Sequence, residues 1–213
     1  MQAILICLFA AASLTNIVAC ASDRQSLRKF SKLLLMPLLL GAYLLSSPET
    51  SGLVVFALIF GWGGDIFMIF KSDERLLSAG IGSFGIGHLL YLAAMIKLMG
   101  TPTVFALVAL PLIFAVGGVI FFLQIRPLID KKLRVPSLFY SLLLSTLGAV
   151  AALLLTVGAK GGVPLLAGAL CFILSDGILA LEIFKNGDSP KQDFAVMLTY
   201  LSAQALLICG FCM

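Results

Sequence analysis

Long apolar runs separated by short polar connections account for almost the whole chain. Each run is long enough to cross a hydrocarbon core of ~30 Å as a helix that rises ~1.5 Å per residue. Leu-rich windows with interior Gly and Pro, rather than short alternating segments, argue against strands that form a barrel. We therefore predict an all-α polytopic membrane protein with a single transmembrane domain, residues 1–213. Its eight predicted helices cover about 3–21, 30–47, 52–70, 76–96, 103–125, 135–158, 161–184 and 194–213.

Composition supports the membrane assignment. Hydrophobic residues make up 61% of the 213 residues and charged residues 11%, and the mean hydropathy is +1.14. These values lie outside the range of soluble globular domains. The connections between the apolar runs are too short to hold a soluble domain.

The basic residues alternate between the two sides of the predicted bundle. Cytoplasmic loops of membrane proteins collect Lys and Arg near helix ends, which predicts a multi-pass inner-membrane protein with both termini extracytoplasmic. The net charge of +4 then reflects topology, so we expect no nucleic-acid partner, and no protein partner is predicted. Alternate loops hold Arg24, Arg28, Lys29, Lys32, Lys71, Arg75, Arg126, Lys131, Lys132, Arg134, Lys185 and Lys191, whereas the opposite side holds Lys97 and Lys160.

Two carboxyl groups, Asp65 and Asp176, interrupt the third and seventh apolar runs. A carboxylate in mid-membrane costs ~3 kcal/mol, so such residues usually face the bundle interior, have a partner and mark a substrate or proton path. The helical rise places Asp65 about 6 Å and Asp176 about 5 Å to the cytoplasmic side of the midplane. We expect the two carboxyls to lie at one level and to act together.

Other polar residues lie at similar depth. His88 and Tyr91 are neighbours one turn apart on the fourth run, as are Tyr200 and Gln204 on the eighth. Each candidate also has a structural interpretation: an intramembrane Asp can simply accept a hydrogen bond, the histidine can be a satisfied buried side chain, and the tyrosines, including Tyr140, can be packing aromatics. Glu182, near the end of its run, is expected to reach the membrane interface.

A faint internal repeat relates the two aspartates. Gly64-Asp65 precedes Lys71-Ser-Asp73, and Ser175-Asp176 precedes Lys185-Asn-Gly-Asp188. A shift of four helices preserves orientation, so this pattern indicates two parallel four-helix halves, each contributing one aspartate.

The motifs around these residues resemble the YhhN-like lysoplasmalogenase family of eight-helix membrane proteins. The resemblance extends over nearly the whole chain. Lys32 and Pro37 correspond to the family's Lys and Pro at the start of its second helix, at a wider spacing than the family's compact pattern. The segments that carry the resemblance are Gly63-Gly-Asp65-Ile-Phe-Met, Phe84-Gly-Ile-Gly-His88-Leu-Leu-Tyr91, Ala167-Gly-Ala-Leu-Cys-Phe-Ile-Leu-Ser175-Asp176 and Tyr200-Leu-Ser-Ala-Gln204.

The resemblance implies hydrolysis of the vinyl ether of lysoplasmalogens. The expected partners are this lysophospholipid substrate and the membrane lipids, and we expect no cofactor and no metal. This reaction protonates the β-carbon of the alkene and forms an oxocarbenium ion that water captures, so it needs an acid and an anion. Asp65 and Asp176 could divide these roles, as paired carboxyls do in glycosidases. Residues expected to position substrate or water are His88, Tyr91, Tyr140, Ser175, Tyr200 and Gln204, with Lys32 contacting the headgroup.

Other functional classes remain open. A proton-coupled transporter of amphiphiles could use the same aspartates as relays. A zinc-dependent membrane hydrolase needs several His ligands, and the chain has one His. A purely structural membrane protein would tolerate loss of both aspartates.

Overall fold

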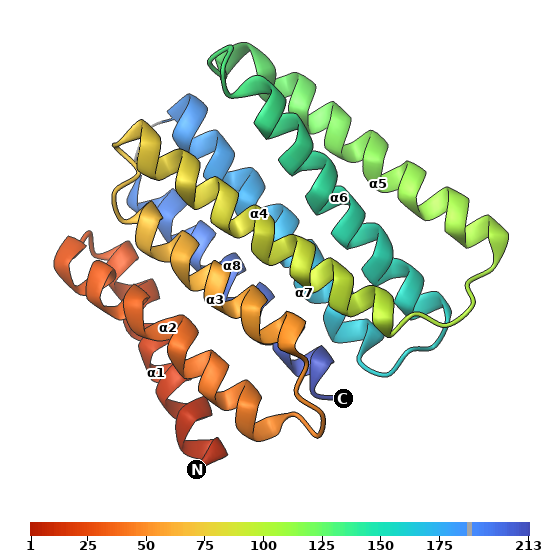
Figure 1. Ribbon diagram of the computed structural model, residues 1–213. Coiled ribbons are helices and arrows are strands. Elements are labelled where there is room, and N and C mark those ends of the chain that lie inside the picture. Colours follow the sequence, from red (N-terminus) through yellow and green to blue (C-terminus); the bar gives the residue numbers. More distant parts are fainter. Residues whose placement is uncertain (187–188) are drawn as a thin grey trace. The chain divides into compact units, whose positions relative to one another are not determined.

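Eight α-helices follow one another along the part of the chain that the structure, a computed structural model, describes: residues 1–186 and 189–213 (Figure 1). No strand occurs in these ranges, so the predicted all-α polytopic bundle is confirmed. A 3-10 turn, Arg126–Leu128, follows α5, and a π-helical segment, Glu182–Asn186, follows α7. The α-helices are α1 Gln2–Ala21, α2 Gln25–Ser46, α3 Gly52–Met68, α4 Glu74–Lys97, α5 Val104–Ile125, α6 Arg134–Thr156, α7 Gly162–Leu181 and α8 Pro190–Phe211.

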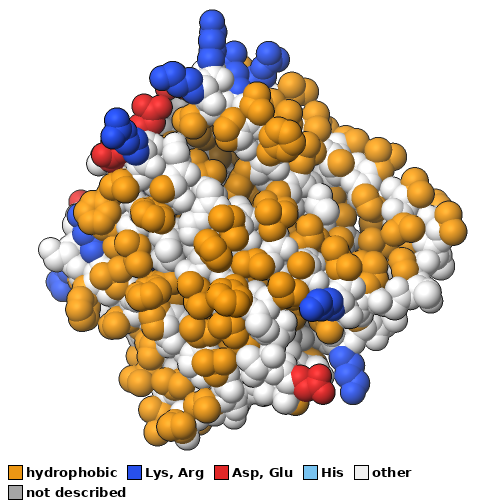
Figure 2. Space-filling model, in the orientation of Figure 1, with side chains coloured by type: hydrophobic (Ala, Val, Ile, Leu, Met, Phe, Trp, Pro, Cys, Tyr) orange, Lys and Arg blue, Asp and Glu red, His pale blue; other side chains and the backbone are white. Residues whose placement is uncertain are grey.

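The lengths of these helices suit a membrane. Within the described residues, seven helices are long and apolar enough to span one. The remaining helix, α3, is a shorter apolar helix of 17 residues, or about 26 Å at ~1.5 Å per residue. Hydrophobic side chains cover much of the face drawn in Figure 2, and an apolar exterior is what lipid requires of a multi-pass protein.

The start of α2 differs most from its prediction. The apolar run predicts a start near residue 30, whereas the helix begins at Gln25. Hydrophobicity marks only the part of a helix inside the hydrocarbon, and the polar first turns of α2 extend beyond it. Lys32 consequently lies about two turns inside the helix rather than at its start.

Contacts divide the chain into two compact units. The first comprises Met1–Ala94 with Cys212, and the second comprises Met95–Phe211 with Met213. The boundary falls in the last turn of α4, so helices α1 to α3 with most of α4 belong to the first unit and α5 to α8 to the second. The single domain and the internal duplication stay predictions, and Asp188 of the proposed repeat lies outside the described residues.

In the first unit, glycines let α3 and α4 approach closely. A Cβ at Gly64 would lie 2.8 Å from the Phe84 ring, and one at Gly87 would lie 3.2 Å from the carbonyl oxygen of Ala57. The Ser83 hydroxyl donates to the Phe60 carbonyl at 2.6 Å across the same interface. Small residues at helix contacts are typical of membrane bundles, and here they pack the helix of Asp65 against the helix of His88.

In the second unit, α7 begins beside the end of α8. Gly161 caps α7 in the left-handed conformation, with φ 73°, and its Cα faces the Gly210 carbonyl so closely that no side chain fits. Further along α7, a Cβ at Gly168 would lie 2.9 Å from Leu207 and 3.0 Å from the Ala203 carbonyl. These close approaches fix the helix that carries Asp176 against α8.

Candidate functional site

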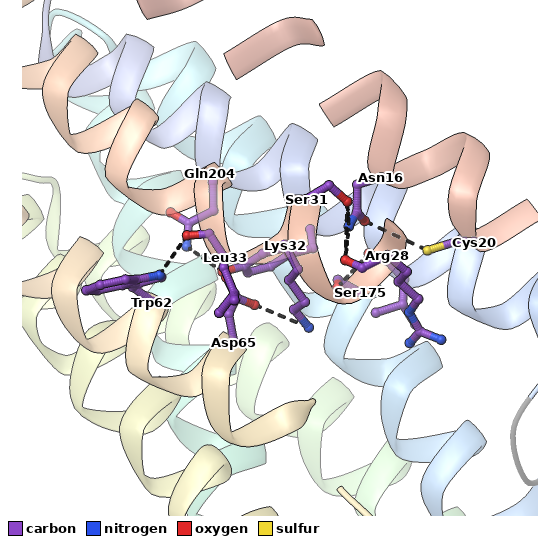
Figure 3. A network of polar contacts seen from close by, with 12 residues as sticks. Asn16, Cys20, Arg28, Ser31, Lys32, Leu33, Trp62, Asp65, Ser175 and Gln204 are labelled. Atoms are coloured by element: carbon purple, nitrogen blue, oxygen red, sulfur yellow. Dashed lines mark hydrogen bonds and ion pairs between the residues drawn. The ribbon is translucent and has the colours of Figure 1, made fainter. Parts of the chain in front are cut away.

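Asp65 of α3 is fully buried and forms an ion pair with Lys32 of α2. The ammonium Nζ lies 3.4 Å from Asp65 Oδ1, and the two side chains are 13% and 0% exposed respectively. Figure 3 shows the two side chains extended toward each other from neighbouring helices. A buried charge is tolerated when an opposite charge accompanies it, so the lysine explains how α3 carries an aspartate in its apolar run.

The position of Lys32 differs from that predicted by the loop pattern. Grouping it with the basic loop residues places it at the interface, whereas α2 extends far enough back to put it beside Asp65. Its ammonium therefore forms an ion pair with a carboxylate of the same unit. A role for Lys32 toward a lipid headgroup stays a prediction.

Trp62 forms a second contact between α2 and α3, one turn before Asp65. Its indole Nε1 donates a hydrogen bond to the Leu33 carbonyl at 3.0 Å (Figure 3). Sequence reasoning did not single out this tryptophan, although it is the only one in the chain. The available signal was Pro37, which lacks the N–H that would otherwise bind the Leu33 carbonyl within the helix.

His88 and Tyr91 of α4 are both buried, with 2% and 1% of their surfaces exposed. The His88 ring hydrogen-bonds to the backbone of Phe84, one turn earlier on α4. One ring nitrogen is therefore engaged within the helix, which restricts the orientation of the imidazole. This arrangement is compatible with either a positioning role or a satisfied structural histidine.

In the second unit, Asp176 of α7 accepts a hydrogen bond from Tyr140 of α6. The phenolic oxygen lies 2.5 Å from Asp176 Oδ2, and both side chains are half-buried. This contact joins two residues that the sequence singled out separately. The phenol is neutral, so the partner of Asp176 differs in charge from the ammonium beside Asp65.

Ser175 faces a different neighbour from Asp176. Its hydroxyl donates to the Val196 carbonyl of α8 at 3.2 Å, and its side chain is buried. Successive residues of an α-helix point about 100° apart, so Ser175 faces α8 while Asp176 faces α6.

Tyr200 and Gln204 of α8 contact each other as their spacing predicts. The Gln204 amide donates to the Tyr200 hydroxyl at 3.4 Å, and both residues are buried. The Tyr200 ring also packs edge-to-face on Phe172 of α7, with ring centroids 5.7 Å apart. The pair thus presents polar atoms inside the second unit.

Comparison with known protein families matches residues 27–211 to the YhhN family. The chain belongs to the YhhN family. The matched segment includes Lys32, both aspartates and every other residue proposed above for the reaction. No curated protein and no solved structure matches the chain.

The buried polar residues of this YhhN-family protein include Glu182, Asp193 and Asn16, which were not predicted to be functional. Glu182 is 0% exposed, so the prediction that it reaches the interface is wrong: it begins the π-helical turn and its carboxylate packs inside. Asp193, in the first turn of α8, is 6% exposed. Asn16 of α1 is fully buried and lies outside the segment matched to the family.

Asn16 joins α1 to α2. Its amide nitrogen donates to the Arg28 carbonyl and to the Ser31 hydroxyl, each at 2.9 Å, and the Cys20 thiol lies 3.8 Å from its side-chain oxygen (Figure 3). It is the only Asn in the first apolar run, which is the signal that could have identified it.

The structure thus brings candidate residues together within each unit: Lys32 with Asp65 in the first, and Tyr140 with Asp176 in the second. The predicted joint action of Asp65 and Asp176 involves one residue of each unit and stays a prediction. Among the described residues, no group of three or more His, Cys, Asp or Glu side chains is placed to hold a metal ion.

Proposed function

We propose that this YhhN-family protein is an intramembrane hydrolase that cleaves the vinyl ether of lysoplasmalogens. The products are a fatty aldehyde and glycerophosphoethanolamine or glycerophosphocholine. The observation that supports this function is the contrast between two intramembrane carboxyls: Asp65 beside an ammonium group and Asp176 beside a phenol. Acid-catalysed vinyl ether hydrolysis needs one carboxyl in each protonation state.

We give each aspartate a role on the basis of its partner. Lys32 compensates the charge of Asp65, so Asp65 is the anion that stabilises the oxocarbenium ion and orients the attacking water. Tyr140 donates to Oδ2 of Asp176, which leaves Oδ1 to carry the proton that is transferred to the β-carbon. Oxocarbenium chemistry in glycosidases divides the same work between two carboxyls.

The remaining steps follow from the chemistry of the intermediate. Water adds to the oxocarbenium carbon and loses a proton to Asp65. When the resulting hemiacetal collapses, Asp65 gives this proton to the departing glycerol oxygen and Asp176 takes the proton of the hemiacetal hydroxyl. The aldehyde and the glycerol hydroxyl are released, and both carboxyls return to their starting protonation states. We propose that the buried polar side chains of α4, α7 and α8 hold the substrate and this water. These are His88, Tyr91, Ser175, Tyr200 and Gln204.

An aldehyde-release assay on the purified full-length protein tests the proposal. Ethanolamine and choline lysoplasmalogens should both be tried, beside a saturated-ether analogue that has no alkene to protonate. Asp65→Asn and Asp176→Asn should each abolish release while the protein stays folded and extractable. Near-wild-type cleavage by either variant would show that the paired-carboxyl mechanism is wrong.

An intramembrane ion pair such as Lys32–Asp65 is also compatible with proton-coupled transport of amphiphiles. Two preparations of the same purified protein distinguish the two functions. Detergent-solubilised protein releases aldehyde only if it is an enzyme, whereas a transporter shows substrate flux in sealed vesicles and leaves the vinyl ether intact.

A further inference from the structure

The backbone of α2 carries a carbonyl that its own helix cannot satisfy. Pro37 lies inside α2 and has no N–H, so the hydrogen bond that residue 37 would donate to the carbonyl of Leu33 is missing. In a hydrocarbon environment no water replaces it, and an unpaired backbone carbonyl costs several kcal/mol. The free acceptor therefore requires a partner from a neighbouring helix.

Trp62 of α3 supplies that partner. Its indole Nε1 lies 3.0 Å from the Leu33 oxygen, and the residue is 37% exposed. An indole N–H in an apolar environment itself needs an acceptor. The contact thus satisfies two groups that would both otherwise be unpaired, which makes it a specific attachment between α2 and α3.

This attachment lies directly beside the ion pair. Lys32 precedes Leu33 on α2, and Asp65 follows Trp62 by one turn on α3. The later residue on α2 contacts the earlier residue on α3, as two antiparallel neighbours require. The two contacts together fix the rotation and the axial register of α2 against α3 at the level of Asp65.

We propose that Trp62 is a positioning residue for Asp65: its hydrogen bond to the carbonyl freed by Pro37 holds α2 so that Lys32 reaches the carboxylate. The role of Asp65 in hydrolysis rests on the function proposed above. The geometric role of Trp62 does not, so the two can be tested separately.

The first arm of the test is independent of catalysis. A small amine-specific reagent is applied to the purified full-length protein, and labelling of Lys32 is compared with labelling of the exposed Lys132 by mass spectrometry. Trp62→Phe keeps an aromatic ring but removes the donor, and should raise the relative labelling of Lys32 severalfold. The Lys132 rate should not change.

A matched control removes a different interhelical hydrogen bond, one that α4 donates to α3. Ser83→Ala deletes a donor to the Phe60 carbonyl, but that carbonyl still has the N–H of Gly64 within α3. Loss of this bond leaves no backbone group unpaired, and Lys32 labelling should stay at the wild-type rate. An equal rise in both variants would mean that Trp62 only contributes general stability, and would overturn the proposal.

A second variant tests the role of the freed carbonyl. Pro37→Ala restores the N–H at residue 37, so the Leu33 carbonyl gains a partner within α2. Adding Trp62→Phe to Pro37→Ala should then change Lys32 labelling by less than about twofold. If Trp62→Phe has the same effect with and without Pro37, the hydrogen bond does not position Lys32 and the proposal is wrong.

The kinetic arm applies once aldehyde release is established. Trp62→Phe should lower kcat about tenfold, because small displacements of catalytic groups are costly, with KM within about twofold. In the Pro37→Ala background the same substitution should leave kcat nearly unchanged. Absence of aldehyde release by wild type would refute the proposed function while the labelling results still decide the role of Trp62.

Discussion

Lys32 and Asp65 form an ion pair between the apolar helices α2 and α3, with Nζ 3.4 Å from Oδ1. Replacing Lys32 by Met should destabilise the protein by about 3 kcal/mol, because a buried carboxylate then loses its compensating charge. The midpoint of thermal or denaturant unfolding in detergent measures this loss. Aldehyde release should fall as well.

The double variant Lys32→Met with Asp65→Leu separates stability from chemistry. Removing both charges eliminates the penalty of an unpaired ion, so most of the lost stability should return. Activity should not return, because Asp65 is absent. If the double variant is as unstable as Lys32→Met alone, the ion pair does not explain the effect of the single substitution.

The Tyr140 hydroxyl donates to Asp176 Oδ2. Asp176→Asn should lower kcat for aldehyde release at least about 100-fold, the usual contribution of a general acid. Tyr140→Phe keeps the carboxyl and removes only its hydrogen bond, so it should have a smaller effect, about tenfold. A larger loss in Tyr140→Phe than in Asp176→Asn would contradict the role given to Asp176.

Asn16 donates to α2 from inside α1. Asn16→Leu should destabilise the protein by about 1 kcal/mol, the typical size of an interhelical hydrogen bond in a membrane. Because Asn16 is outside the proposed catalytic residues, kcat and KM should stay near wild-type values. Unfolding in detergent and the aldehyde assay measure the two outcomes.

Gly161 and Gly158 both have positive φ, 73° and 65°, but their surroundings differ. A Cβ at residue 158 would have no heavy atom within 4 Å. Gly158→Ala should therefore lower the unfolding free energy only by the strain of the left-handed conformation, about 1 kcal/mol. Gly161→Ala would push its Cβ into the Gly210 carbonyl, so its unfolding free energy should fall by at least about 3 kcal/mol. Equal effects of the two substitutions would contradict this difference in packing.

The distribution of Lys and Arg predicts that both termini lie outside the cytoplasm. A carboxyl-terminal fusion to alkaline phosphatase should therefore be active in cells, whereas a fusion to a fluorescent protein that folds only in the cytoplasm should be dark. The reverse pattern would invert the predicted orientation. It would leave the proposed chemistry unchanged.

The sequence by itself determined the helices and the two aspartates. In lipid, backbone groups must be satisfied within the spanning segment, so the length of an apolar run is enough to predict a helix, and a carboxyl inside such a run is conspicuous. The main error concerns the start of α2, because residues Gln25 to Lys29 are helical but were not predicted to be. They lie outside the apolar run, and hydrophobicity does not indicate how far a helix extends beyond the hydrocarbon.

Only the tertiary structure decided which groups meet. Three contacts depend on how each helix is rotated and on which helix is its neighbour. They are the ion pair of Lys32 with Asp65, the hydrogen bond of Tyr140 to Asp176, and the hydrogen bond of Trp62 to the Leu33 carbonyl that Pro37 leaves unpaired within α2. The hydrophobic pattern does not determine the rotation or the neighbours of a helix, because nearly every face of these helices is apolar and periodicity gives no preferred side. Contacts between particular side chains fix them instead.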